Sequence, residues 1–205
     1  MDDFYGGGAR TLQRRFDTER LAERIEQRLV RDRLSEDDRA FIERMDMFFI
    51  ATVDAQGRPS CSYKGGEPGF VRVLDDRTIA FPSFDGNGMY LSTGNVLDTS
   101  HVGLIFVDFV AQMRLRFDGE ATIDMDDPLL ASCPEAQFVV RVRARAIFPN
   151  CPRYVHKMTL AERSRFVPKG GCATPVPAWK QREWAKDALP ESDPARDPAR
   201  EVADR

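Results

Sequence analysis

The chain has 205 residues, the length of one ordinary domain or of one domain with tails. Hydrophobic residues make up 42% of it and charged residues 31%, which is typical of a globular protein, and no apolar run approaches the roughly 20 residues that a membrane helix needs. The formal net charge of -3 argues against a general nucleic-acid binder, because such proteins usually carry a basic face.

The N-terminal part of the chain predicts an extended lead-in followed by a helix. Residues 1–17 begin with an acidic, glycine-rich stretch and are expected to be extended. Over residues 18–33, Leu21, Ile25 and Leu29 recur at every fourth position among charged residues. This spacing places them on one face of a helix, and we expect that face to pack against a core.

A second helix is predicted over residues 36–45. Ser35 is a favourable N-cap residue, and Asp38 follows three positions later as an aspartate version of the capping box. The apolar residues Phe41 and Ile42 give this helix a face that can pack against the same core.

From residue 47 the pattern changes to short extended segments. Residues 48–54 read FFIATVD, residues 59–64 read PSCSYK, and the turn between them contains Gly57, which can adopt a positive φ. These features predict a β-hairpin. The segments that follow predict strands over 70–74 and 78–82, a short helix over 89–97, strands over 101–109 and 112–123, a short helix from 126, and a strand over 137–148.

Six or seven strands with few helices between them predict a mainly β fold with flanking helices, built as an antiparallel barrel. Residues 137–148 alternate apolar side chains with Arg141, Arg143 and Arg145, so this long strand has one apolar face and one basic face. The basic face is expected either to be solvated or to contact acidic groups across an interface.

The composition divides the chain into four parts. The tail repeats the tetrapeptide DPAR and lacks an apolar face, which predicts disorder. The parts are an N-terminal extension with two helices over 1–46, a barrel domain over 47–148, an irregular segment over 149–189 with a terminal helix over 178–189, and the tail over 190–205.

The cysteines and histidines do not have the spacing of a zinc site, so no metal is expected. The chain is long enough to fold without disulfides, and its first residues lack the basic and apolar regions of a secretory signal. We therefore expect a cytoplasmic protein with reduced thiols. There is also no G-x-S-x-G elbow, no P-loop, and no G-x-G-x-x-G after a strand.

Polar residues recur on the strand over 59–64. Ser60, Ser62 and Lys64 are spaced by two and therefore share one face, while Cys61 and Tyr63 lie on the other. A central strand that is polar or small on both faces calls for an explanation. Hydroxyl groups beside an ammonium group suit an anionic ligand.

Two further segments offer polar groups near strand ends. The glycine-containing loop over 83–88 precedes a predicted helix, and backbone amides at a helix N-terminus bind phosphate well. Gln112, Arg114 and Arg116 share one face of a later strand, which either contacts a ligand or is a solvated barrel face.

Residues 47–123 resemble the flavin-binding split barrel of the pyridoxamine 5'-phosphate oxidase superfamily. The resemblance is carried by F-I-A-T-V-D followed by G-R-P over 49–59, by V-G-L-I-F over 102–106, and by R-L-R-F-D-G-E-A over 114–121. It implies an antiparallel split β-barrel that binds FMN, a homodimer that shares its flavin sites, and an oxidoreductase activity on an unidentified small molecule. It singles out no catalytic residue.

The resemblance also implies which residues contact the flavin. The strand after the Gly-x-Pro turn lies along the flavin in that superfamily, and the loop after the fourth strand contacts its ribityl and phosphate groups. A polar residue of a later strand adds a contact. The corresponding residues here are Ser60, Ser62, Tyr63 and Lys64, then Pro82, Ser83, Asn87 and Gly88, and finally Arg114 with Arg116.

The departures from the pattern indicate a divergent member rather than the vitamin B6 enzyme. Asn87 and Gly88 stand where those enzymes have an Arg-Lys pair, and Arg114 stands where they have Gln. Two alternatives remain. One is a protein of the same fold that holds haem, with His101 or His156 as axial ligand, or a deazaflavin, or that senses redox state. The other is a non-enzymatic interaction protein.

Overall fold

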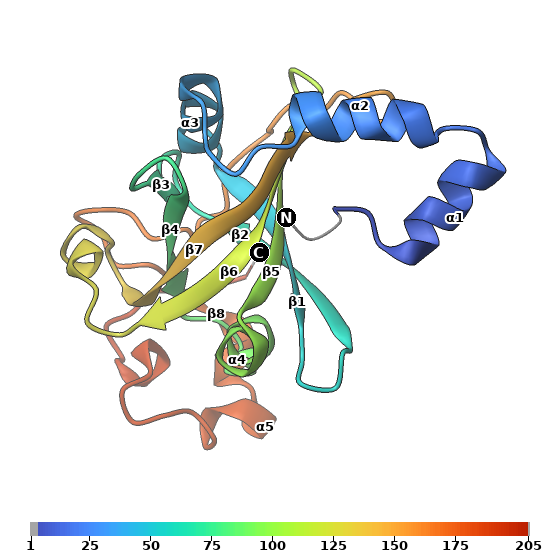
Figure 1. Cartoon of the computed structure of the whole chain (residues 1–205). Coiled ribbons are helices and arrows are strands. Elements are labelled where there is room, and N and C mark those ends of the chain that lie inside the picture. The colour runs from blue at the N-terminus through green and yellow to red at the C-terminus, as the bar shows by residue number, and fades with distance from the viewer. Residues whose placement is uncertain (1–3, 205) are drawn as a thin grey trace.

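The computed structural model describes residues 4–204, and its centre is a seven-stranded sheet in which every neighbouring pair is antiparallel. The strand order is β2-β1-β5-β6-β7-β4-β3, and the sheet curls into the split β-barrel that the sequence predicts (Figure 1). The strands are β1 (Met47–Val53), β2 (Pro59–Gly65), β3 (Arg72–Val73), β4 (Thr78–Phe84), β5 (His101–Asp108), β6 (Met113–Asp124) and β7 (Ala136–Pro149).

The predicted hairpin is present as β1 and β2, whose register pairs Val53 with Pro59 and Met47 with Gly65. Gly57 has a φ of +80° in the turn, which an L side chain rarely adopts. Strand β2 pairs only with β1 and therefore forms one edge of the sheet, while β3 forms the other.

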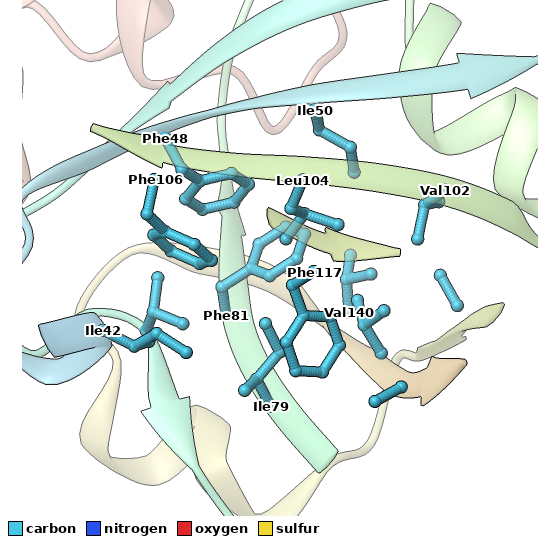
Figure 2. Close-up of a cluster of buried hydrophobic side chains, with 14 of the residues drawn as sticks. Ile42, Phe48, Ile50, Ile79, Phe81, Val102, Leu104, Phe106, Phe117 and Val140 are labelled. Atoms are coloured by element: carbon cyan, nitrogen blue, oxygen red, sulfur yellow. The ribbon is translucent and has the colours of Figure 1, made fainter. Parts of the chain in front are cut away.

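The core fills the inner face of the curled sheet. Phe48, Phe81, Phe106 and Phe117 come from four different strands and are almost completely buried. Figure 2 shows these rings gathered with aliphatic side chains from the neighbouring strands. Phe48 contacts Phe81 edge-on, with ring centroids 4.9 Å apart, and Phe106 at 5.3 Å. Burial of these rings is the main favourable contribution to folding.

A register shift between β6 and β7 changes which side chains of β7 face the core. Gly119 pairs with Ala144 and Asp118 pairs with Ala146, so Arg145 is the extra residue of a β-bulge. Beyond the bulge Ile147 is the residue of β7 that points into the core, and it is completely buried. The sequence predicts that the even-numbered apolar residues of this strand face the core, and this holds only as far as Ala144.

The helix α3 (Glu36–Glu43) confirms the predicted cap. The Ser35 hydroxyl accepts a hydrogen bond of 3.2 Å from the Asp38 backbone N–H, and the Asp38 carboxylate accepts one of 2.8 Å from the Ser35 backbone N–H. Phe41 and Ile42 are buried in the core, as expected. Arg31 adds an ion pair of 2.5 Å to Asp38.

The helix α2 (Glu19–Leu29) is shorter than predicted, and its apolar face is not covered. The chain leaves the helix because Arg31 exchanges two backbone hydrogen bonds with Ile147 of β7. Leu21, Ile25 and Leu29 remain exposed, so the expectation that they pack against the core is wrong. Figure 1 shows α2 running beside the barrel instead of over it.

The extended lead-in predicted before α2 is also wrong. Residues Gly7–Arg15 form the helix α1, which has no side-chain N-cap and no buried residue. Two arginines in its last turn interact favourably with the negative end of the helix dipole. In Figure 1, α1 lies farther from the barrel than α2.

The helix α4 (Leu91–Thr99) packs against β1, β2 and β6, two residues later in sequence than predicted. Asn95 donates a hydrogen bond of 2.9 Å to the buried Thr52 hydroxyl, and Thr99 donates one of 2.7 Å to the Val53 carbonyl. These bonds attach α4 to β1 and fix its N-terminal end next to β2.

The chain beyond β7 is mostly irregular. Instead of one terminal helix it forms the 3₁₀ turn η2 (Ala178–Gln181) and the short helix α5 (Glu183–Lys186). In the tail, where composition predicts disorder, β9 (Val202–Ala203) pairs with β8 (Val176–Pro177). The remaining short elements are the 3₁₀ turns η1 (Pro128–Ser132) and η3 (Pro194–Arg196).

Within residues 4–204, none of the helices combines the length and the hydropathy required to span a lipid bilayer.

We predict that Gly119→Ala destabilises the protein and that Gly94→Ala does not. A Cβ atom on Gly119 would lie 2.1 Å from the Arg143 carbonyl oxygen, so β6 and β7 would have to separate. The free energy of unfolding in urea should fall by at least about 2 kcal/mol. In α4 a Cβ on Gly94 meets nothing within 4 Å, and alanine there should add about 0.5–1 kcal/mol. Equal effects of the two substitutions would contradict this account of the bulge.

Candidate functional site

Lys64 lies where β2 meets the N-terminal end of α4. Its Nζ donates a hydrogen bond of 3.0 Å to Oγ of Ser92, the second residue of α4. The side chain is partly buried, and this burial lowers the pKa of Lys64. Within residues 4–204 no carboxylate forms an ion pair with this ammonium group. A half-buried cation without a counter-charge favours an anion beside it.

Two serine hydroxyls continue the face of β2 that carries Lys64. Ser60 and Ser62 pair with Thr52 and Ile50 of β1, so they point to the inner side of the sheet. The Oγ atom of Ser62 is buried without a hydrogen-bond partner. A buried unpaired hydroxyl costs free energy, so a ligand that bonds to it would be stabilised.

The N-terminal end of α4 has no side-chain cap. Tyr90 occupies the N-cap position in the left-handed conformation, with a φ of +48°. The first backbone N–H groups of a helix have no partner within it, and here no cap side chain accepts from them. Together with Lys64, this end of α4 has the donors and the partial positive charge that bind phosphate.

Tyr63 lies on the opposite face of β2 and is 59% exposed. Its ring contacts Phe49 of β1 edge-on, with centroids 5.8 Å apart. Partial burial raises the pKa of Tyr63, and the negative charge of Asp46 raises it further. The phenol is therefore a neutral hydrogen-bonding group at neutral pH.

Arg114 and Arg116 lie on β6 and share the outer face with Tyr63, but β1 and β5 separate the two strands. The Arg116 guanidinium forms an ion pair of 3.2 Å with Asp118 and lies 5.4 Å from the centroid of the Phe148 ring. Arg114 donates to the Cys151 carbonyl, while its Nε is buried without a partner.

The predicted loop begins later than expected because β4 continues through Phe84. Pro82 is buried, and Ser83 pairs with Phe138 within the sheet. Asn87 and Gly88 lie in the exposed loop before α4, where the Asn87 side chain accepts 3.1 Å from the Met89 backbone N–H. Neither Pro82 nor Ser83 is part of this loop.

The structure thus divides the ten predicted residues into separate groups. Ser60, Ser62 and Lys64 share the inner face of β2, and Lys64 contacts Ser92, which the sequence analysis did not identify. The signal for Ser92 in the sequence is its position at the start of a helix that follows a glycine-containing loop. The other groups are Asn87 with Gly88 in the loop, Pro82 with Ser83 in β4, and Tyr63, Arg114 and Arg116 on the outer face.

A cleft of about 960 Å³ lies on the other side of the loop that precedes α4, between residues 84–90 and the C-terminal segment. Lys180 joins its two walls: the buried ammonium group contacts Asp85 at 2.5 Å and Asp193 at 2.8 Å. The two tryptophans of the chain, Trp179 and Trp184, lie in this cleft with their rings stacked. No element of the sequence pattern indicated this arrangement.

The two histidines lie apart from these groups. His101 is the first residue of β5 and His156 lies in the irregular segment after β7; both are exposed. In the described part of the chain, no three His, Cys, Asp or Glu side chains are grouped so that they could hold a metal ion.

Comparison with known proteins identifies the family. The sequence profile described as pyridoxamine 5'-phosphate oxidase matches residues 34–164. The profile therefore includes α3 and all seven strands of the sheet, and it excludes α1, α2 and the C-terminal wall of the cleft. No curated protein sequence matches the chain significantly.

Several solved structures are similar in part. A proposed pyridoxamine 5'-phosphate oxidase from Lactobacillus delbrueckii is 24% identical, over 58% of this chain and 95% of that one, with a TM-score of 0.47. An FMN-binding protein from Syntrophomonas wolfei is 15% identical over 68% and 97%, with a TM-score of 0.45. HutZ, the heme storage protein from Vibrio cholerae, is 20% identical over 57% and 96%, with a TM-score of 0.41.

The contact of Lys180 with Asp193 sets the pH range over which the C-terminal segment is held. Burial alone would raise the pKa of Asp193, but hydrogen bonds from Lys180 and from the Ala195 N–H hold it below its ordinary value. Burial would lower the pKa of Lys180, but the two carboxylates raise it. The stabilisation is therefore complete above the unfolded Asp pKa of about 3.9 and below the unfolded Lys pKa of about 10.4.

We predict that the segment detaches as the pH falls below about 4, through the folded pKa of Asp193, and that Asp193→Asn detaches it at pH 7. Both tryptophans would then become more exposed to water, so their fluorescence emission should shift to the red while the far-UV circular dichroism of the barrel is retained. Asp187→Asn, an exposed aspartate of the same segment, is the matched control. Unshifted emission in Asp193→Asn at pH 7 would show that the ion pair does not hold the segment.

Proposed function

The chain belongs to the pyridoxamine 5'-phosphate oxidase family, and we propose that it is an FMN-binding oxidoreductase that acts on a small molecule. The observation that carries this proposal is the group around Lys64. A partly buried ammonium group, which has no carboxylate partner among residues 4–204, lies next to an uncapped helix N-terminus. That combination favours a phosphate ester over an uncharged ligand.

The residues of this group fit the phosphate end of FMN. Lys64 supplies the positive charge, the first amides of α4 supply directed donors, and the unpaired Ser62 hydroxyl supplies a further hydrogen-bonding group. This donor set performs the role that an Arg-Lys pair would otherwise have at Asn87 and Gly88. The departure at these two positions is therefore compatible with phosphate binding.

The edge of β2 is suited to the flavin ring. Because β2 pairs only with β1, the backbone N–H and C=O groups of its other edge are free to bond to the ring heteroatoms. A bound flavin supplies the redox chemistry as a carrier of hydride or single electrons. The chain itself binds the phosphate, orients the ring along β2 and presents the Tyr63 phenol beside it.

We further propose that the protein is a homodimer joined through the outer face of the sheet. Phe49, Tyr63 and Ile105 lie on this face on the neighbouring strands β1, β2 and β5, and they are only partly covered. An apolar patch of this kind marks an interaction surface. A second copy packed on this face would bring its Arg116 toward Tyr63 of the first copy. A flavin at the interface could then contact both residues, although β1 and β5 separate Tyr63 from Arg116 within one chain.

The visible absorption spectrum of the purified protein distinguishes the candidate cofactors. We expect the two-band spectrum of an oxidised flavin, bleached when NADPH or NADH is added without oxygen. A Soret band would instead identify haem, and a single band near that of deazaflavins would identify that cofactor. A protein that remains colourless after incubation with FMN would contradict the proposal and leave the non-enzymatic alternative.

We predict that Lys64→Met weakens FMN binding at least about tenfold and leaves riboflavin binding unchanged. Riboflavin lacks the phosphate, and a hydrogen bond to a charged group contributes about 1.5–3 kcal/mol. Both affinities can be measured by titrating the apoprotein and following the quenching of flavin fluorescence.

The exposed Lys157→Met is the matched control, since it removes the same charge elsewhere on the chain. The site assignment would be wrong if Lys64→Met bound FMN as tightly as the wild type. It would also be wrong if the substitution weakened FMN and riboflavin equally, because Lys64 would then not contact the phosphate.

We predict that the protein sediments as a dimer of its 23.3 kDa chain and that Ile105→Glu makes it monomeric. A glutamate at this position would place a charge at the centre of the outer face, where a partner would desolvate it. Leu160→Glu, at an exposed apolar residue of the C-terminal segment, should leave the dimer intact. Analytical ultracentrifugation gives the answer, and a dimeric Ile105→Glu would assign the interface to another surface.

A further inference from the structure

The cleft between the β4–α4 loop and the C-terminal segment has the size of a small-molecule site. Its volume of about 960 Å³ lies in the range of about 300–1,000 Å³ that is typical of ligand pockets. One wall is formed by residues 84–90 with the turn at 135–137, and the other by β8, η2, α5 and residues 188–194. The second wall lies outside residues 34–164, so this cleft is an addition to the family's common core.

Aromatic side chains line both walls. Trp179 and Trp184 lie on the C-terminal wall with centroids 5.8 Å apart and ring planes within 12° of parallel. Trp184 is nevertheless 68% exposed, which leaves much of its indole surface free. Phe84 and Tyr90 lie on the facing wall. Aromatic rings on two facing surfaces favour a flat ring between or against them.

Each charged group of the cleft is in an ion pair, and three carboxylates face two cations. Lys180 holds Asp85 and Asp193, and Arg200 forms an ion pair of 2.9 Å with Glu135. In the described chain every charged residue that lines the cleft is one of these five. An anionic ligand would be repelled by the excess carboxylate, whereas a neutral ligand would not.

The cleft also offers polar groups that could orient a ring substituent. Gln137 accepts a hydrogen bond of 3.1 Å from the Tyr90 hydroxyl and retains its own amide N–H groups as donors. The loop contributes backbone groups at Gly86 and Gly88, where no side chain covers them. A few polar groups in a mainly aromatic cleft are what gives a ligand a defined orientation.

We propose that this cleft binds a flat, neutral aromatic compound with a hydroxyl or carbonyl substituent, stacked on Trp184. The cleft shares the loop over 85–90 with the phosphate site, since Tyr90 lines the cleft and precedes the helix that presents Ser92 to Lys64. If the bound compound is a substrate, that role rests on the proposed flavin function. The binding of the compound to the cleft does not depend on a flavin.

The test measures binding of 1-naphthol to the full-length protein by equilibrium dialysis. We expect saturable binding of one molecule per chain, at least fivefold tighter than binding of naphthalene-1-sulfonate, which adds a charge, and of decahydro-1-naphthol, which is not flat. The proposal is overturned if 1-naphthol does not bind saturably, or if either analogue binds as tightly.

Two variants locate the bound compound. Trp184→Ala removes the exposed ring, and Ala188→Trp fills the cleft from an exposed position without removing a buried group. Each should weaken 1-naphthol binding at least fivefold, while Tyr154→Ala, an 82% exposed aromatic outside the cleft, should not. Unchanged binding in Ala188→Trp, or equal loss in Tyr154→Ala, would place the compound elsewhere.

Lys64→Met separates this inference from the flavin proposal. The variant should retain the wild-type affinity for 1-naphthol, because Lys64 does not line the cleft. If the wild-type protein binds 1-naphthol but does not bind FMN, the result would support the cleft and contradict the flavin function. Loss of 1-naphthol binding in Lys64→Met would contradict the cleft assignment.

Discussion

The close approach of β6 and β7 at Gly119 is the contact on which the barrel depends. These are the two longest strands, and they lie at the centre of the sheet order. At Gly119 the backbone of β7 comes so near that a Cβ atom would collide with a carbonyl oxygen. The bulge at Arg145 reverses the faces of β7, so Ile147 enters the core on the same side as Phe117. The curled sheet can therefore surround four buried phenylalanine rings.

The curled sheet leaves β2 as an edge strand beside the helix α4. Hydrogen bonds from Asn95 and Thr99 to β1 hold α4 in place, and they bring its uncapped end to Lys64. The polar inner face of β2 is thus next to a helix terminus rather than to the aromatic core. In the described part of the chain the buried Ser62 hydroxyl has no hydrogen-bond partner and the Lys64 ammonium group has no carboxylate partner. Both are costs to folding, which is why we attribute them to ligand binding.

The parts of the chain outside the family profile have different structural roles. The helices α1 and α2 bury almost nothing against the barrel, and α2 leaves its apolar face exposed. The C-terminal segment instead folds back onto the β4–α4 loop, where Lys180 is buried between carboxylates from both. Lys180 and Asp193 are both almost completely buried, and removing water from these two charges is costly, so their pairing has to be close. This pairing places both tryptophans in the cleft that faces the loop before α4.

The sequence by itself determined the elements whose signals are local. The Ser35 cap and the hairpin at Gly57 each depend on a few neighbouring residues, and the structure has both, while the alternation of β7 holds as far as the bulge. The resemblance over residues 47–123 likewise identified the split barrel and its family. Only the tertiary structure decided that Ser92 meets Lys64, that Arg114 and Arg116 lie two strands from Tyr63, and that Lys180 joins two segments. Lys64 and Ser92 are 28 positions apart along the chain, and Lys180 and Asp85 are 95 apart. The reason is that local periodicity specifies which face a side chain takes, whereas strand order, bulges and ion pairs specify what that face meets.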